Sequence, residues 1–133
     1  MKRGSIARLR RLIRLAECLY EQEARNAKAL IQARDEAVMT AGITRGYLER
    51  DTLVGNAFPD LVRARTVRLQ KHAGELREKA DEQVAAVAAA RGRVKGLEAK
   101  LQLEITVNEH ERQASTLDEA IDQYVRRALT SLP

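Results

Sequence analysis

Few residues in this chain have the type and spacing that catalysis or metal binding requires. The only two histidines, His72 and His110, are far apart in the sequence, and Cys18 is the single cysteine. Zinc sites need several histidines or cysteines at close spacing, and phosphate sites of the P-loop type need a glycine-rich loop, which is not found here. The sequence therefore predicts a protein that is not an enzyme and that has no metal ion or cofactor.

The remaining polar candidates are more simply explained as parts of helices. The acidic pairs Glu109/Glu111 and Asp118/Glu119 are expected on a solvated helix face rather than in acid–base catalysis. Cys18 lies beside an apolar stripe and is expected to be a small buried hydrophobe. His72 lies on or beside a second stripe in a stretch rich in Arg and Lys, so it is either an ordinary helix residue or a protein-contact residue.

Composition favours an all-α chain of long helices. Aromatic residues make up 3% and charged residues 32% of the 133 residues, and charged, aliphatic sequences of this kind are typical of coiled coils. The net charge is +5, but residues 1–14 alone carry +6 and leave −1 for the rest. A nucleic-acid-binding face along the whole chain is therefore not expected. No apolar stretch approaches a membrane span, and a soluble cytoplasmic protein is expected.

Periodic apolar residues predict two helices joined by a turn region. The first pattern runs from about residue 5 to 41, with Ser5 as its N-cap. Turn-forming residues, four of them glycine or proline, fill the region 42–59. The second pattern runs from about 60 to 129, with proline and aspartate at its start.

Two helices with so short a connection are expected to fold as one antiparallel coiled-coil hairpin over residues 1–133. Because the second helix is much longer, about 30 of its residues extend beyond the first. Apolar residues in this overhang would then face water, which implies a partner protein; they are Leu97, Leu101, Ile105, Leu117, Ile121 and Val125. The acidic stretch 104–122 complements the basic start, but a tight hairpin does not bring the two together, so the role of residues 1–14 stays open.

Three short motifs resemble the FliJ family of flagellar export proteins and the related stalk proteins of virulence type III secretion systems. The first is Ala41-Gly42-Ile43-Thr44, where the first helix is predicted to end. The second is Phe58-Pro59 followed by Leu61, Leu69, His72 and Leu76. The third is Leu117-Asp118-Glu119-Ala120 followed by Arg126-Arg127. Their order and spacing agree with the family over nearly the whole chain.

The resemblance implies a non-enzymatic stalk that links a hexameric export ATPase to the membrane-embedded export gate, with export chaperones as further partners. It implies contact with the ATPase ring through residues near both termini: Arg8, Arg11, Leu12, Leu117, Ile121 and Tyr124. It also implies contact with the gate through four residues of the second helix: Leu61, Leu69, His72 and Leu76. Such a protein meets the membrane only through its partners. The sequence leaves open whether the system is flagellar or an injectisome.

Three other functions are compatible with the sequence. A generic scaffold would self-associate through the overhang. A nucleic-acid-binding coiled coil would use residues 1–14 and 61–71 and would lose affinity steeply with salt. A membrane-surface protein would use Ile6 to Leu19 as an interfacial helix.

Overall fold

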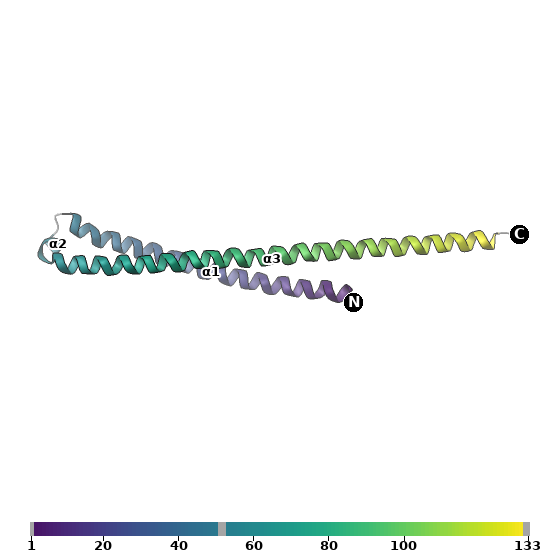
Figure 1. Cartoon of the computed structure of the whole chain (residues 1–133), viewed down its shortest axis with the longest axis horizontal. Helices are drawn as coiled ribbons and strands as arrows, with labels where there is room; N and C mark the ends of the chain where they lie inside the picture. Colours follow the sequence, from purple (N-terminus) through teal and green to yellow (C-terminus); the bar gives the residue numbers. More distant parts are fainter. Residues whose placement is uncertain (1, 51–52, 132–133) are drawn as a thin grey trace. The chain divides into compact units, whose positions relative to one another are not determined.

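The computed structural model describes residues 2–50 and 53–131, and these are almost entirely helical. Helix α1 spans Lys2–Glu49, α2 spans Leu53–Ala57 and α3 spans Pro59–Thr130 (Figure 1). No strand occurs within these two ranges. The prediction of an all-α fold is therefore confirmed.

The predicted end of the first helix at residue 41 is wrong, because α1 continues to Glu49. Gly42 and Gly46 do not break it, since neither adopts a positive φ, and a helical glycine costs only about 1 kcal/mol relative to alanine. Burial of Ala41 and Thr44 favours the extra turns. An ion pair between Arg45 Nε and Glu49 Oε1, at 2.9 Å, spans the last of these turns.

The two long helices, α1 and α3, begin in different local sequences. Helix α1 begins at Lys2 rather than after Ser5, so the predicted N-cap at Ser5 is also wrong. Helix α3 begins at Pro59, a residue whose fixed φ suits a first turn, and Asp60 follows where the helix dipole favours an acid. The predicted turn region 42–59 thus contains the last turns of α1 and the whole of α2.

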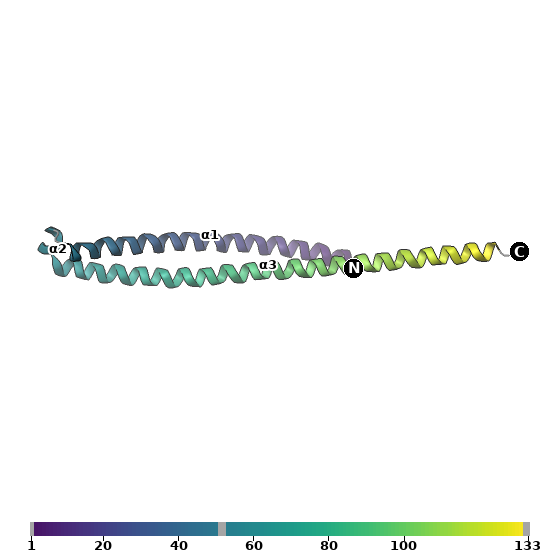
Figure 2. The ribbon, with the colours of Figure 1, turned by 90° about the horizontal axis from the view of Figure 1, so that it is seen from above.

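The chain divides into two compact units, Glu17–Gly92 and Met1–Ala16 with Arg93–Pro133. In the first, which we call the hairpin unit after the arrangement proposed for it below, the two long helices run beside each other in Figure 2 and cross in the view of Figure 1. Its most buried apolar residues are mainly alanines, and all are small or medium-sized: Ala27, Ala41, Val62, Ala73, Ala80 and Ala90. Small side chains let two helix backbones approach each other closely.

Buried and half-buried positions in the hairpin unit recur at alternating steps of three and four residues. On α1 the series runs through residues 20, 23, 27, 30, 34, 37, 41, 44 and 48, and residues 24, 31, 33 and 46 beside it are half-buried too. On α3 the series runs through residues 62, 66, 69, 73, 76, 80, 83, 87 and 90, and residue 86 beside it is half-buried too. This spacing averages 3.5 residues, the period of a left-handed coiled coil.

The threonine and glutamine residues at these positions have hydrogen-bond partners. The hydroxyl of Thr44 donates to the carbonyl of Thr40 at 3.0 Å, and that of Thr66 donates to the carbonyl of Val62 at 2.8 Å. Gln83 Nε2 donates across the two helices to the backbone carbonyl of Glu23 at 3.1 Å and also to its Oε2. Satisfied polar groups of this kind are tolerated in a packed interface.

The second unit, which we call the terminal unit, contains residues from both ends of the chain. Leu9 and Ile13 of α1 are buried, at 6% and 8% exposure. On α3, residues 94, 97, 101, 104 and 108 continue the same spacing and are half-buried. From residue 109 to 131, which we call the tail, every residue is exposed. The start of α1 therefore covers α3 only as far as about residue 108.

Replacing Gly74 or Gly96 by alanine is expected to stabilise the helix that contains it. A Cβ built at either position meets no atom within 4 Å, and neither glycine has a positive φ. Each substitution should therefore raise the free energy of unfolding by about 0.5–1 kcal/mol. Urea unfolding followed by circular dichroism measures this. A loss of stability would contradict the open surroundings of the two glycines.

Candidate partner-binding surfaces

The residues with possible chemical roles lie on the surface and apart from one another. His72 and His110 are both exposed. Cys18 is exposed too, so the expectation that it is a buried hydrophobe is wrong; Ala16, two residues earlier, is half-buried instead. Within residues 2–50 and 53–131, no three His, Cys, Asp or Glu side chains gather as a metal site requires. The features of this chain that suit recognition are apolar and charged surfaces.

The six residues predicted to contact an ATPase ring all belong to the terminal unit and are all exposed. Arg8, Arg11 and Leu12 lie on α1, where Leu12 is 40% exposed next to the buried Ile13. The other three lie on the tail, with Leu117 at 62%, Ile121 at 51% and Tyr124 at 75% exposure. We call these six residues the terminal surface.

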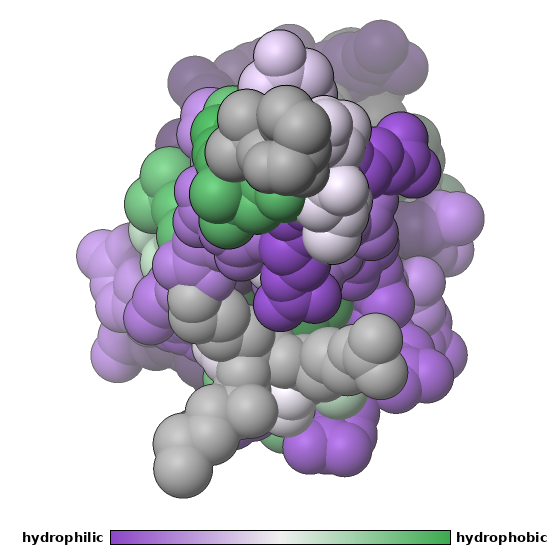
Figure 3. Space-filling view, turned by 90° about the vertical axis from the view of Figure 1, so that its right-hand side faces the viewer, coloured by the Kyte–Doolittle hydropathy of each residue, from purple (hydrophilic) through white to green (hydrophobic). Residues whose placement is uncertain are grey.

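The tail is an unusual helix because all of its large apolar residues are exposed. Val125 and Leu129 are exposed as well, at 47% and 64%, and continue the stripe that begins at Leu117. Figure 3, a view from the end where α3 finishes, shows hydrophobic residues at the surface among hydrophilic ones. A stripe of this length is typical of a helix that packs against another protein.

The four residues predicted to contact an export gate lie on one side of α3 in the hairpin unit. Their helical spacing places them within about 80° of one another, at 100° per residue. Leu61 is 67% exposed and His72 is also exposed. Leu69 and Leu76 are half-buried at the edge of the contact with α1. Of the four residues in this surface, only Leu61 and His72 are therefore fully accessible to solvent.

A further apolar surface on α1 was not predicted. Met39, Ile43 and Tyr47 are spaced by four residues and are 67%, 58% and 42% exposed. With Gly42, Gly46 and Arg50 they line a hollow of about 410 Å³. The spacing was visible in the sequence, but the two glycines placed Ile43 and Tyr47 in the predicted turn region 42–59. Their helical phase was therefore not considered.

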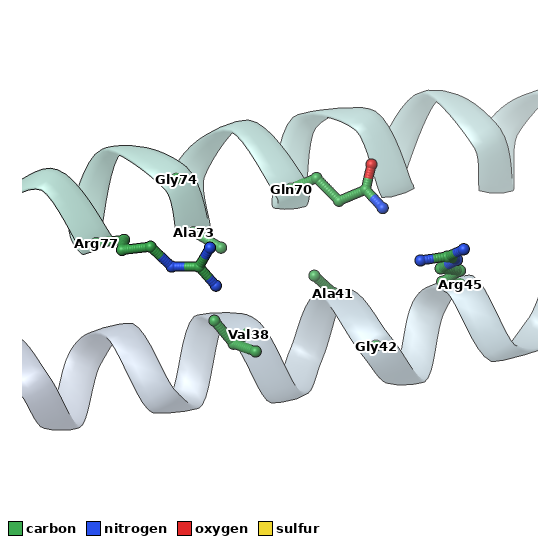
Figure 4. A pocket seen from close by; sticks show the side chains of 8 residues that line it. All are labelled: Val38, Ala41, Gly42, Arg45, Gln70, Ala73, Gly74 and Arg77. Carbon is green, nitrogen blue, oxygen red and sulfur yellow. The ribbon is translucent and has the colours of Figure 1, made fainter.

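Another hollow, of about 460 Å³, lies between α1 and α3 in the hairpin unit. Figure 4 shows Val38 and Ala41 of α1 facing Ala73 and Arg77 of α3 across it. It exists because small residues stand opposite each other, with Gly42 and Gly74 beside the two alanines. Arg45, Gln70 and Arg77 give it a polar rim. Its openness to solvent suits a partner side chain better than an enclosed ligand.

Comparisons with known proteins add no family assignment. No protein-family model, curated protein or solved structure matches the chain. Among the described residues, no helix is both long enough and apolar enough to cross a membrane. The surfaces described above are therefore the basis for the function proposed next.

Proposed function

We propose that α1 and α3 form an antiparallel coiled-coil hairpin. The alternating steps of three and four on both helices support this. The pairing order in the hairpin unit supports it too. Glu23, early in α1, contacts Gln83 of α3, whereas Val38 and Ala41, later in α1, face the earlier residue Ala73.

We further propose that the chain is the non-enzymatic central stalk of a type III export apparatus, flagellar or virulence-related, working in the cytoplasm. The observation that carries the proposal is the tail: residues 109–130 are helical and every one of them is exposed, yet they carry an apolar stripe. A long helix in water gains most of its stability from packing of its apolar face. A hexameric export ATPase would provide that packing by enclosing the terminal surface in its central pore.

The hairpin unit would hold the other partners in this proposal. The export gate would contact the α3 surface formed by Leu61, Leu69, His72 and Leu76, where Leu61 and His72 are the most accessible. The hollow lined by Met39, Ile43 and Tyr47 provides a second apolar surface in the same unit, which suits an export chaperone. The chain would then meet the membrane only through the gate.

The effect of the chain on an export ATPase tests the stalk function. We expect the purified chain to raise the hydrolysis rate of the export ATPase from the same organism and to favour its hexamer. A chain that enters the pore binds only the assembled ring, and so shifts the equilibrium toward the hexamer by mass action. Hydrolysis assays and light scattering, with and without the chain, measure both effects. An unchanged rate and an unchanged hexamer fraction at saturating chain would exclude this function.

A further inference from the structure

The terminal unit carries two uncovered surfaces of opposite charge. Residues 8–14 of α1 contain four arginines and no acidic residue. The tail between residues 109 and 122 contains five acidic residues and one arginine, a net charge of −4. All these charged residues are exposed.

Each charged surface also has exposed apolar residues. On α1, Leu12 and Leu15 are 40% and 59% exposed, although Ile13 between them and Leu9 before them are buried. On the tail, Leu117 and Ile121 are 62% and 51% exposed. Leu12 and Leu15 are three residues apart and Leu117 and Ile121 are four apart, so each pair lies on one face of its helix.

These two surfaces do not cover each other within one chain. The half-buried positions of α3 in the terminal unit stop at residue 108, and the acidic stretch of the tail lies beyond that point. The arginines at residues 8–14 and the acidic residues at 109–122 are therefore offset along the unit. Only another molecule can bring such surfaces together.

We propose that the occupant is a second copy of this chain, and that the protein alone is a two-fold symmetric dimer. In this dimer the tail of each copy packs on the α1 surface around Leu12 and Leu15 of the other. The acidic stretch of the tail then lies beside the arginines of residues 8–14. The contact is made twice, and two-fold symmetry closes the assembly at two copies instead of allowing a filament.

The proposal does not depend on an export ATPase. If the stalk function also holds, the ring and the second copy use the same surface and exclude each other. The dimer would then be the form of the chain before it enters the ring. Failure of the dimer and failure of the stalk function are measured separately, the first on the chain alone and the second on the ATPase.

Sedimentation equilibrium of the full chain over a range of concentrations tests the dimer. We expect a reversible monomer–dimer equilibrium that weakens as salt screens the charges. The double variants R8E/R11E and D118R/D122R should each raise the dissociation constant by at least about tenfold, because each places like charges across both contacts. The variant R93E/K95E changes the net charge as R8E/R11E does, at exposed positions outside both surfaces, and should dimerise normally.

Mixing the two disrupted variants gives the sharpest result. An equimolar mixture of R8E/R11E and D118R/D122R should form a heterodimer with nearly wild-type affinity, because opposite charges then face each other at both contacts. Circular dichroism checks that both variants keep their helices. A wild-type chain that is monomeric at every concentration, a larger or open-ended assembly, or a mixture that stays monomeric would overturn the proposal.

Discussion

An Ala80→Leu variant is expected to lose about 1–3 kcal/mol of unfolding free energy, because it adds three carbon atoms where two helices touch. Ala80 is the most completely buried residue described, with 0% exposure. Urea unfolding followed by circular dichroism measures the loss. The larger side chain can be accommodated only if α1 and α3 move apart, which also weakens the neighbouring contact of Gln83 with Glu23.

Ala88→Leu is the matched control for this variant. Ala88 lies on the same helix in the same unit, but it is exposed. The same change there should alter the unfolding free energy by no more than about 0.5 kcal/mol. Equal effects at both positions would contradict the close packing of α1 against α3, as would an Ala80→Leu variant as stable as the wild type.

A double variant I121D/Y124D is expected to abolish the effect of the chain on the export ATPase while leaving the chain folded. Ile121 and Tyr124 are 51% and 75% exposed, so the isolated chain loses little packing when they become polar. Inside a ring, two carboxylates would lose their water without gaining a partner, a loss that costs several kcal/mol. Stimulation of hydrolysis should therefore fall to the level seen without the chain.

Leu53→Asp serves as the control for that experiment. Leu53 is 86% exposed, so the change again replaces an exposed apolar residue by a carboxylate, but it lies in α2 of the hairpin unit. We expect normal stimulation from this variant. If I121D/Y124D stimulates as well as the wild type, the tail is not the ring-binding element; if both variants fail, the effect is not specific to the tail.

The period of the apolar residues was enough to predict the helical fold and most of the buried stripe. It did not distinguish between adjacent apolar residues that both fit the period. Ile13 is buried at 8% exposure whereas Leu12 is 40% exposed, and Val62 is buried at 8% whereas Leu61 is 67% exposed. Which of the two neighbours is buried depends on how each helix is rotated about its axis relative to the other. Tertiary packing sets this rotation.

Polar residues in the stripe were harder to predict for a different reason. Thr44 and Thr66 are buried at 7% and 6% exposure because each hydroxyl bonds to a carbonyl one turn earlier in its own helix. That bond makes a threonine behave as an apolar residue at a helix contact. Gln83 is half-buried, whereas its apolar neighbour Val84 is 49% exposed. Its bond to Glu23 depends on the pairing of two helices distant in sequence.

The candidate surfaces inside the predicted helices were identified from the sequence. The surface that extends into the predicted turn region was missed. The exposure of Leu117, Ile121 and Val125 followed from the unequal lengths of the two predicted helices. Leu97, Leu101 and Ile105 were expected to face water as well, but they are half-buried because α1 covers α3 as far as about residue 108. The Met39, Ile43 and Tyr47 surface was missed because glycine was given too much weight as a helix breaker. In a helix held by a packed partner, the cost of a glycine is smaller than the gain from burying the next turn.

Hydrogen exchange of the tail, with and without the export ATPase, tests the central claim most directly. At concentrations where the chain is monomeric, the amides of residues 109–131 should exchange rapidly, since every residue of this stretch is exposed. Adding the assembled ATPase should slow their exchange strongly, while the amides around Ala73 and Ala80 change little. Tail amides that exchange at the same rate with and without a saturating amount of the ring would contradict a stalk whose tail enters it.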